Sequence, residues 1–297
     1  NHLLYDVVRG VTKTIKSSTN GAEVTDSGGL TSFDSDGFSV GSKGSLNNSS
    51  ASIVAWNWKA GGSASSNTDG SITSTVSANT TAGFSILTFT GTGSSATVGH
   101  GLGAVPKAIL FKKTSGAQGW GVYHDGVGNT GSLRLDGTDG TTTSSDFFNN
   151  TSPTSSVFTV NVNNSVNNSG GTMLAYCFAE KKGYSKFGSY TGNGNADGPF
   201  IYTGFKPAWV MIKPSSYANS WLLLDNKRPG FNVTNDRLEA DGNGAENDSI
   251  DHADFLSNGF KIRTSNAHPN NSGGTLIYAA FAESPFVSSS GIPTTAR

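Results

Sequence analysis

The chain of 297 residues has one cysteine and only 14% charged residues, and its formal net charge is −1. The single Cys177 excludes an intrachain disulfide framework. The near-neutral charge gives no reason to expect nucleic acid or an anionic membrane as a partner. No stretch approaches the roughly 20 apolar residues of a membrane span. The sequence therefore predicts no nucleic-acid partner and no membrane insertion.

Apolar residues are present in short runs. Hydrophobic residues make up 34% of the chain and aromatic residues 10%, enough for packed cores that aromatic side chains anchor. The runs are rich in β-branched and aromatic residues and are bounded by Gly, Asn, Asp or Pro, which is the pattern of β-strands. Examples are residues 52–56, 83–89, 108–111, 157–160 and 200–202. The sequence predicts an all-β fold of tandem antiparallel β-sandwich, jelly-roll-like modules.

The chain repeats itself. The string NNSGGTLIYAAFAE at 270–283 reappears as NNSGGTMLAYCFAE at 167–180, and more loosely as NNSSASIVAWNWKA at 47–60. Trp120 of the middle copy recurs as Trp221, about 100 positions later. A repeat of this length is one small domain used several times. The Asn-rich turn before each final apolar run predicts a hairpin, because Asn and Gly tolerate positive φ.

The first copy lacks its opening half, since residues 1–10 line up with residues 220–229, Asp6 with Asp225 and Arg9 with Arg228. Half a sandwich would leave an apolar face and unpaired strand edges. We therefore expect the natural protein to extend upstream, or another chain to complete this domain. The expected units are 1–60 (the second half of a first repeat), 61–82 (a Gly/Ser/Thr-rich linker), 83–182 and 183–286 (complete repeats) and 287–297 (a tail). The end of the linker could add an edge strand, because Ile72 and Val76 share one face by period-2 spacing.

The residue types that commonly catalyse reactions do not stand at the spacings typical of catalytic sites in this sequence. The histidines do not stand at metal-ligand spacing, and there is no Gly-x-Ser-x-Gly motif. His124-Asp125 resembles a general base with its orienting partner, yet the same register holds aspartate in the other copies. Glu180 and Glu283 are equivalent positions of two copies, which favours a structural role, such as pairing with Arg or Lys at a module junction. The sequence predicts no enzymatic activity and no catalytic residue.

Two ligand hypotheses follow from the loops. Hard oxygen ligands on a Gly-containing loop suggest a calcium site, although their spacing is not that of an EF-hand. An aromatic residue on a loop can stack on a sugar face, and Tyr217 in the loop 214–219 is the best such candidate. Trp120 and Trp221 are expected to be core anchors, and Trp56 and Trp58 to be packed as well. The proposed calcium ligands are Asp241, Asn243, Glu246 and Asp248.

Several long strings resemble a known repeat domain of tailed bacteriophages. They are GYSKFGSYTGNG at 183–194, GPFIYTGFKP at 198–207, FLSNGFKIRTS at 255–265 and YAAFAESPF at 278–286. This domain occurs in large virion proteins, commonly of marine phages, that are described as tail fibre or structural proteins. The resemblance covers roughly residues 1–60 and 83–286. The middle copy departs from the pattern at Val157-Phe158 and at His124, and residues 287–297 depart from the basic-aromatic ending of the family.

The resemblance implies a non-enzymatic virion structural protein, a tail-fibre or appendage segment that contacts host-surface glycans at several weak sites acting together. The implied partners are other virion proteins and further copies of the chain, as a homo-oligomer such as a trimer, together with host polysaccharide. Two alternatives remain open: a capsid or tail decoration protein that grips neighbouring subunits, and a carbohydrate-active enzyme.

Overall fold

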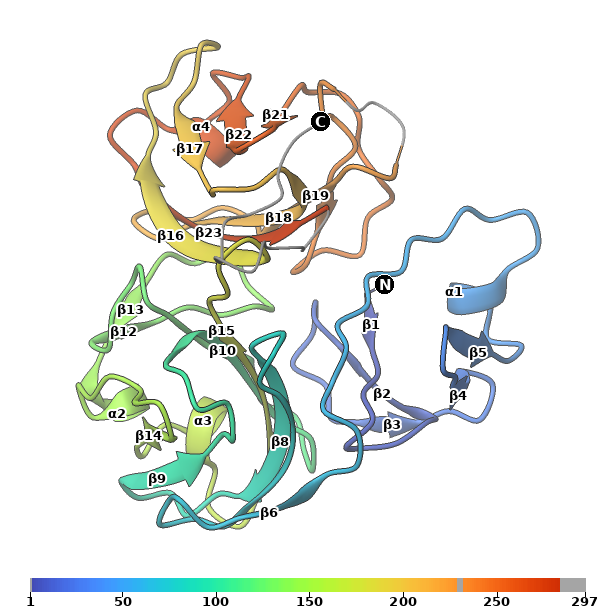
Figure 1. Cartoon of the computed structure of the whole chain (residues 1–297), viewed down its shortest axis with the longest axis vertical. Coiled ribbons are helices and arrows are strands. Elements are labelled where there is room, and N and C mark those ends of the chain that lie inside the picture. The colour runs from blue at the N-terminus through green and yellow to red at the C-terminus, as the bar shows by residue number, and fades with distance from the viewer. Residues whose placement is uncertain (1, 229–231, 284–297) are drawn as a thin grey trace.

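The computed structural model describes residues 2–228 and 232–283, which form small antiparallel sheets grouped in three lobes around a common centre (Figure 1). The predicted all-β sandwich class is confirmed. We name the lobes repeat 1 (residues 2–60), repeat 2 (residues 61–182) and repeat 3 (residues 183–283). The expected tail 287–297 lies outside the described residues. Within the described ranges, no helix is long and apolar enough to cross a membrane.

Repeat 2 is built on a six-stranded sheet of order β11-β10-β15-β8-β7-β6, with smaller two-stranded sheets β12-β13 and β14-β9. A core of buried side chains lies between the large sheet and the β14-β9 layer. Its elements are β6 (Ser65–Asn67), β7 (Ser74–Asn79), β8 (Phe84–Thr90), β9 (Ala96–Gly99), β10 (Pro106–Lys113), β11 (Gly121–His124), β12 (Gly131–Ser132), β13 (Thr142–Thr143), α2 (Ser145–Phe148), β14 (Val157–Val160), α3 (Asn164–Asn167) and β15 (Thr172–Ala179).

Repeat 3 has the same plan, with a five-stranded sheet of order β16-β23-β18-β19-β20 and a three-stranded sheet of order β17-β22-β21. Its own core lies between these two sheets. Its elements are β16 (Ser185–Thr191), β17 (Phe200–Tyr202), β18 (Pro207–Pro214), β19 (Leu222–Asp225), β20 (Leu238–Glu239), β21 (Ala253–Leu256), β22 (Gly259–Ile262), α4 (Ala267–Asn270) and β23 (Thr275–Ala282).

Repeat 1 is smaller. Its elements are β1 (Leu3–Leu4), β2 (Lys13–Lys16), β3 (Val24–Thr25), β4 (Leu30–Phe33), β5 (Phe38–Val40) and α1 (Gly44–Asn47). The strand expected at 52–56 does not form, since residues 51–60 belong to no strand. The corresponding strands β15 and β23 each pair on both sides, with β8 and β10 or with β16 and β18. Repeat 1 contains no equivalent of those neighbours among its described residues.

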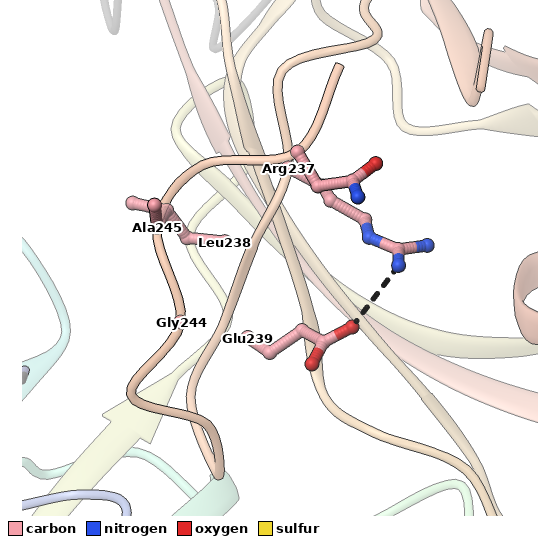
Figure 2. A pocket seen from close by; sticks show the side chains of 6 residues that line it. Arg237, Leu238, Glu239, Gly244 and Ala245 are labelled. Carbon is pink, nitrogen blue, oxygen red and sulfur yellow. Dashed lines mark ion pairs between the residues drawn. The ribbon is translucent and has the colours of Figure 1, made fainter. Parts of the chain in front are cut away.

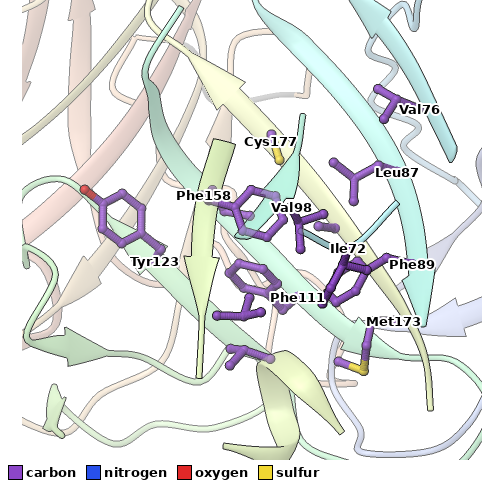
Figure 3. Packing of buried hydrophobic residues seen from close by; sticks show 14 of the residues in the cluster. Ile72, Val76, Leu87, Phe89, Val98, Phe111, Tyr123, Phe158, Met173 and Cys177 are labelled. Atoms are coloured by element: carbon purple, nitrogen blue, oxygen red, sulfur yellow. The ribbon is translucent and has the colours of Figure 1, made fainter. Parts of the chain in front are cut away.

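The segment 61–82 is not a linker. It supplies β6 and β7, and β7 pairs along its whole length with β8, from Ser74↔Phe89 to Asn79↔Phe84. Ile72 and Val76 are buried in the core of repeat 2 (Figure 3). Its polar composition suggested flexibility, but alternate residues in a strand face opposite sides, so few apolar positions suffice to hold it.

The last strand of each complete repeat is buried on both faces. In β15, Met173 and Cys177 point into the core of repeat 2 (Figure 3), whereas Leu174 and Tyr176 belong to an apolar cluster that all three repeats share. The period-2 alternation of a strand places these residues on opposite faces. Cys177 is fully buried among apolar side chains, and burial raises the pKa of its thiol.

The Asn-rich turns are not hairpins. They close the one-turn helices α3 and α4, and the last helical residue of each, Asn167 or Asn270, is fully buried. Asn167 Oδ1 accepts from the Thr92 amide (2.8 Å) and its Nδ2 donates to Ser94 O (2.7 Å). Asn270 makes the corresponding bond with the Asn193 amide (2.8 Å). The repeated asparagine therefore ties the helical turn to the loop that follows β8 in repeat 2 and β16 in repeat 3.

Candidate functional site

Three rings at the same position of the three repeats meet at the centre of the molecule. They are Trp58, Phe178 and Phe281, which align through the shared strings ending at residues 60, 180 and 283. The ring centroids are 6.3 Å apart for Trp58 and Phe178, 5.4 Å for Trp58 and Phe281, and 6.0 Å for Phe178 and Phe281. All three pairs are edge-to-face, which is a favoured aromatic geometry. The lobes therefore surround a common axis with approximate threefold symmetry.

Each complete repeat also inserts a lysine into the repeat before it. Lys112 and Lys213 are fully buried at the ends of β10 and β18. Lys112 Nζ donates to Asn20 O in repeat 1 (3.2 Å), and Lys213 Nζ donates to Thr138 O in repeat 2 (2.9 Å). Two further carbonyl groups of its own repeat accept from each ammonium. An ammonium has three donors, so each lysine is fully satisfied. Burial lowers the pKa of both lysines to about 8.

The tryptophan that follows each lysine reaches the same neighbour. Trp120 Nε1 donates to Lys16 O in repeat 1 (3.0 Å), and Trp221 Nε1 donates to Arg134 O in repeat 2 (2.8 Å). Both indole side chains are fully buried. Their predicted role as core anchors is confirmed, and the core that they anchor is shared between repeats.

The third junction closes the ring between repeats 1 and 3. His2 stands where the other repeats have tryptophan, and its ring bonds the backbone of Glu239. Ser17 Oγ donates to Ala240 O (2.6 Å). Trp56 Nε1 donates to Asp225 Oδ2 (3.2 Å). Because each repeat contacts both others, the junctions are cyclic, as the arrangement of lobes in Figure 1 indicates.

At every junction, the residue at the position of Asp6 and Asp225 forms a hydrogen bond with the neighbouring repeat. Asp225 Oδ1 accepts from the amides of Lys227 (2.9 Å) and Arg228 (3.0 Å), and its other oxygen faces Trp56. Asp6 makes the same turn, and the hydroxyl of Tyr176 in repeat 2 donates to its Oδ2 (2.8 Å). In repeat 2 this position is occupied by His124, for which the sequence favoured a structural role over that of a catalytic base.

His124 performs the same structural task with different atoms. Its Nδ1 accepts from the Gly126 amide (3.0 Å), so Nε2 carries the proton and donates to Tyr278 O in repeat 3 (3.1 Å). Asp125 does not orient His124, because its carboxylate pairs with Lys107 (2.9 Å). Burial lowers the pKa of His124 to about 4. Both ring nitrogens are engaged, so the geometry favours the structural interpretation over the catalytic one.

Glu180 and Glu283 are both ion-paired to lysine. Glu180 pairs with Lys186 (2.8 Å) and accepts from the Phe187 amide across the border between repeats 2 and 3. Glu283 pairs with Lys206 (2.9 Å). Pairing with lysine is confirmed for both residues. Only Glu180 pairs across a junction, because Lys206 belongs to the same repeat as Glu283.

The proposed calcium ligands do not form one site. Asp241 Oδ1 accepts from the Trp221 amide (2.8 Å), and Glu246 pairs with Arg228 (2.6 Å). Asn243 and Asp248 are exposed on the same loop. Among residues 2–228 and 232–283, no three Asp, Glu, His or Cys side chains converge as metal ligands. The calcium prediction was wrong because the carboxylates of Asp241 and Glu246 are already engaged in contacts with the Trp221 amide and with Arg228.

A small hollow of about 140 Å³ opens beside this loop. Figure 2 shows that Arg237 and Glu239 face each other across it, and their side chains are 3.5 Å apart. Its other lining residues are Leu238, Gly244, Ala245 and Asn247. The hollow lies on the part of repeat 3 that corresponds to the surface of repeats 1 and 2 into which the lysines insert.

Tyr217 is half-buried and is not a free stacking platform. Its hydroxyl donates to Ala267 O (2.7 Å), and its ring covers Gly274. The more exposed aromatic residues lie on β17, where Phe200 and Tyr202 are 45% and 64% exposed. They share one face of the strand because they are two positions apart. The sequence predicted this strand, but the strand pattern alone could not show which of its faces is exposed.

The buried lysines were not predicted as functional residues. The only signal was their recurrence at the end of matched strands, which gives no information about burial. Lysine is seldom fully buried, and here the acceptor that makes burial possible comes from a different repeat.

A family model described as a domain of unknown function, DUF7483, matches residues 1–285. The chain therefore belongs to that family. No curated protein and no solved structure matches the chain.

Proposed function

We propose that this member of the DUF7483 family is a non-enzymatic structural protein of a bacteriophage virion, and that it acts as a rigid block within a tail fibre or related appendage. The observation that carries this proposal is the cyclic closure of three repeats around Trp58, Phe178 and Phe281. A ring of this kind resists separation of its lobes, because each lobe completes the core of its neighbours. Rigidity is what a load-bearing part of a particle requires.

The placement of reactive groups supports the non-enzymatic part of the proposal. Cys177 is buried, His124 bonds two backbone groups, and both repeated glutamates are paired with lysine. A catalytic site needs such groups to converge on a space that a substrate can enter. Here they serve the junctions and turns of the fold.

A decoration protein on the capsid or tail is a second candidate. The observation that favours it is the exposed apolar side of repeat 1, where Phe33, Phe38 and Ile53 are 41%, 40% and 49% exposed, since such a surface can grip a neighbouring subunit. Antibodies against the purified chain distinguish the two candidates when virions are imaged by electron microscopy. Label confined to the fibres or other appendages supports the first candidate, and label over the shell or along the tail supports decoration. Intact and disrupted virions that both lack the chain would exclude both.

Contact with host glycans is a further part of this proposal, and Phe200 and Tyr202 are its best candidates. Exposed aromatic faces stack on sugars. A glycan array probed with the purified chain should give signals that Tyr202→Ala abolishes and Tyr217→Phe retains. Absence of signal at high protein concentration would remove glycan binding, and release of reducing ends from host polysaccharide would replace the non-enzymatic proposal.

A further inference from the structure

Repeat 1 exposes side chains whose equivalents are fully buried elsewhere. Ile53 is 49% exposed, whereas Met173 and Leu276 at the same repeat position are 0% exposed. Phe33 and Phe38 form a cross-strand pair in the β4-β5 hairpin and are 41% and 40% exposed. The corresponding pair in repeat 3 is 1% and 0% exposed. Apolar side chains at core positions of a repeated fold, left open in one copy, mark an interaction surface.

The backbone is open at the same place. β1 pairs only with β2, while its equivalents β11 and β19 pair with β10 and β18 on the other edge. Residues 51–60 pair with no strand, while β15 and β23 have partners on both sides. In repeat 3, β18 lies between β23 and β19, and β16 lies on the outer side of β23. Residues 51–60 correspond to β23 and β1 to β19, so repeat 1 has room for one strand between 51–60 and β1 and for a second on the outer side of 51–60.

The acceptor for a third buried lysine is also present. Asn20 and Thr138 stand four positions after Lys16 and Arg134, the residues that accept from the tryptophans. Four positions after Glu239, which accepts from His2, stands Asn243. Asn243 is exposed, and no backbone amide of the described residues donates to its backbone oxygen. The hollow beside it is lined by Gly244 and Ala245 of the same loop (Figure 2).

We propose that the open side of repeat 1 binds a two-stranded polypeptide segment with the pattern of residues 183–214. Its second strand pairs with β1 and 51–60, and its lysine, equivalent to Lys213, donates to the backbone oxygen of Asn243. The apolar face of the segment covers Ile53, Phe33 and Phe38. The occupant is a partner segment of this family. In the two complete junctions, a strand of the family donates a buried lysine to the preceding repeat, and the third junction has no such strand among the described residues.

A second copy of the chain is a poorer occupant. Its strands β8, β10, β16 and β18 are already paired within their own sheets. Supplying any of them to repeat 1 would open a complete repeat, so apolar surface would be exposed there while apolar surface is covered here. The bound segment must therefore be one that is not already part of a complete repeat.

The probe for this surface is a synthetic peptide of residues 183–219, added to the full chain. The reporter is the Ile53→Cys variant, whose introduced thiol should react rapidly with a thiol reagent, whereas Cys177 is buried. Bound peptide should slow that reaction at least about tenfold, and should leave an introduced thiol in the Ser169→Cys variant unaffected. A peptide carrying Lys213→Met should bind at least about tenfold more weakly, because loss of a charge-assisted hydrogen bond has that magnitude.

A fusion of residues 183–219 directly before Asn1 covers the case in which the free peptide does not fold. This order restores the chain path of repeat 3, in which Ser220 follows residue 219. The fusion should raise Tm and protect the Ile53→Cys thiol. No protection in either format would overturn the proposal, and equal binding by the Lys213→Met peptide would overturn the lysine contact. Protection that appears without peptide and rises with chain concentration would assign the surface to a second copy instead.

Discussion

Phe178 and Phe281 occupy the same position in consecutive repeats, and their rings meet edge to face at 6.0 Å with an interplanar angle of 66°. Trp58 supplies the third ring from repeat 1, although residues 51–60, which carry it, form no strand. Repeat 1 therefore keeps the central aromatic contact, although it lacks the sheet that carries this residue in repeats 2 and 3. Attachment of repeat 1 to the rest of the molecule depends on this centre together with the side-chain and backbone bonds of its junctions.

The first prediction concerns Trp58. Trp58→Ala should lower the free energy of unfolding by about 3 kcal/mol, because a large ring is lost from a centre that Phe178 and Phe281 cannot refill. Hydrogen exchange should show that β1 to β5 lose protection before repeats 2 and 3 do. Ile53→Ala is the matched control, since Ile53 lies on the same segment but is half exposed, and its effect should stay within about 0.5 kcal/mol. Equal effects of the two variants would contradict a shared aromatic centre.

The second prediction concerns Lys112. Lys112→Met should cost about 3 kcal/mol, because it leaves buried carbonyl groups without a donor at the border of repeats 1 and 2. Lys113→Met is the matched control, because Lys113 is the next residue on β10 and is partly exposed, and it should change stability by less than about 1 kcal/mol. Chemical denaturation of both variants supplies the comparison. A Lys112→Met variant as stable as the parent would show that the inserted ammonium contributes no net stability.

The sequence predicted the fold class and the complete repeats because these depend on local signals. Strand-length apolar runs set the elements, and recurrence at matched spacing located Trp120 and Trp221 as core anchors. The assignment of 61–82 as a linker was wrong because a half-buried strand of Ser and Thr has the composition of a linker, and only the spacing of Ile72 and Val76 pointed to a strand at its end. Its register is decided by Ile72 and Val76, which only the neighbouring β8 and the core can select.

The ring itself could not be predicted from the sequence. Alignment identified Asp6, His124 and Asp225 as equivalent, but gave no reason for the histidine. The reason lies in the next repeat. Asp6 faces the hydroxyl of Tyr176, whereas His124 faces a backbone carbonyl and needs a donor. The recurrence of a residue along the chain does not show which repeat its side chain contacts, so these contacts appear only when the lobes are placed in space.

The third prediction tests this exchange of donor and acceptor. His124→Asp should cost about 1 to 3 kcal/mol, because a carboxylate oxygen would face Tyr278 O and the donor to that carbonyl would be lost. Asp125→Asn is the control, since Asp125 makes only an exposed ion pair with Lys107, and its effect should be within about 0.5 kcal/mol. Thermal unfolding of the two variants at pH 7 provides the measurement. A neutral effect of His124→Asp would indicate that water satisfies this junction.

The fourth prediction is a loss of stability in mild acid. Burial lowers the pKa of all five histidines, to about 4 for His124 and about 3 for His252. Between about pH 6.5 and the folded pKa, the unfolded chain binds protons that the folded chain does not. Stability should therefore fall with decreasing pH, by on the order of 1.4 kcal/mol per pH unit for each histidine that titrates only when unfolded. Urea unfolding at pH 7, 6 and 5 measures this slope above the range in which carboxylates titrate.

His252 separates this effect from general acid sensitivity. Neither of its ring nitrogens has a hydrogen-bond partner among the described residues, although the side chain is fully buried. His252→Leu removes two unsatisfied polar atoms, so stability at pH 7 should be unchanged or higher. The free energy of unfolding of this variant should fall less steeply between pH 7 and pH 5, because one of the five histidines that bind a proton more readily in the unfolded chain has been removed. A parent chain whose stability is flat across this range would contradict the neutral, buried state of the histidines, and an unchanged slope in His252→Leu would exclude His252 as a contributor.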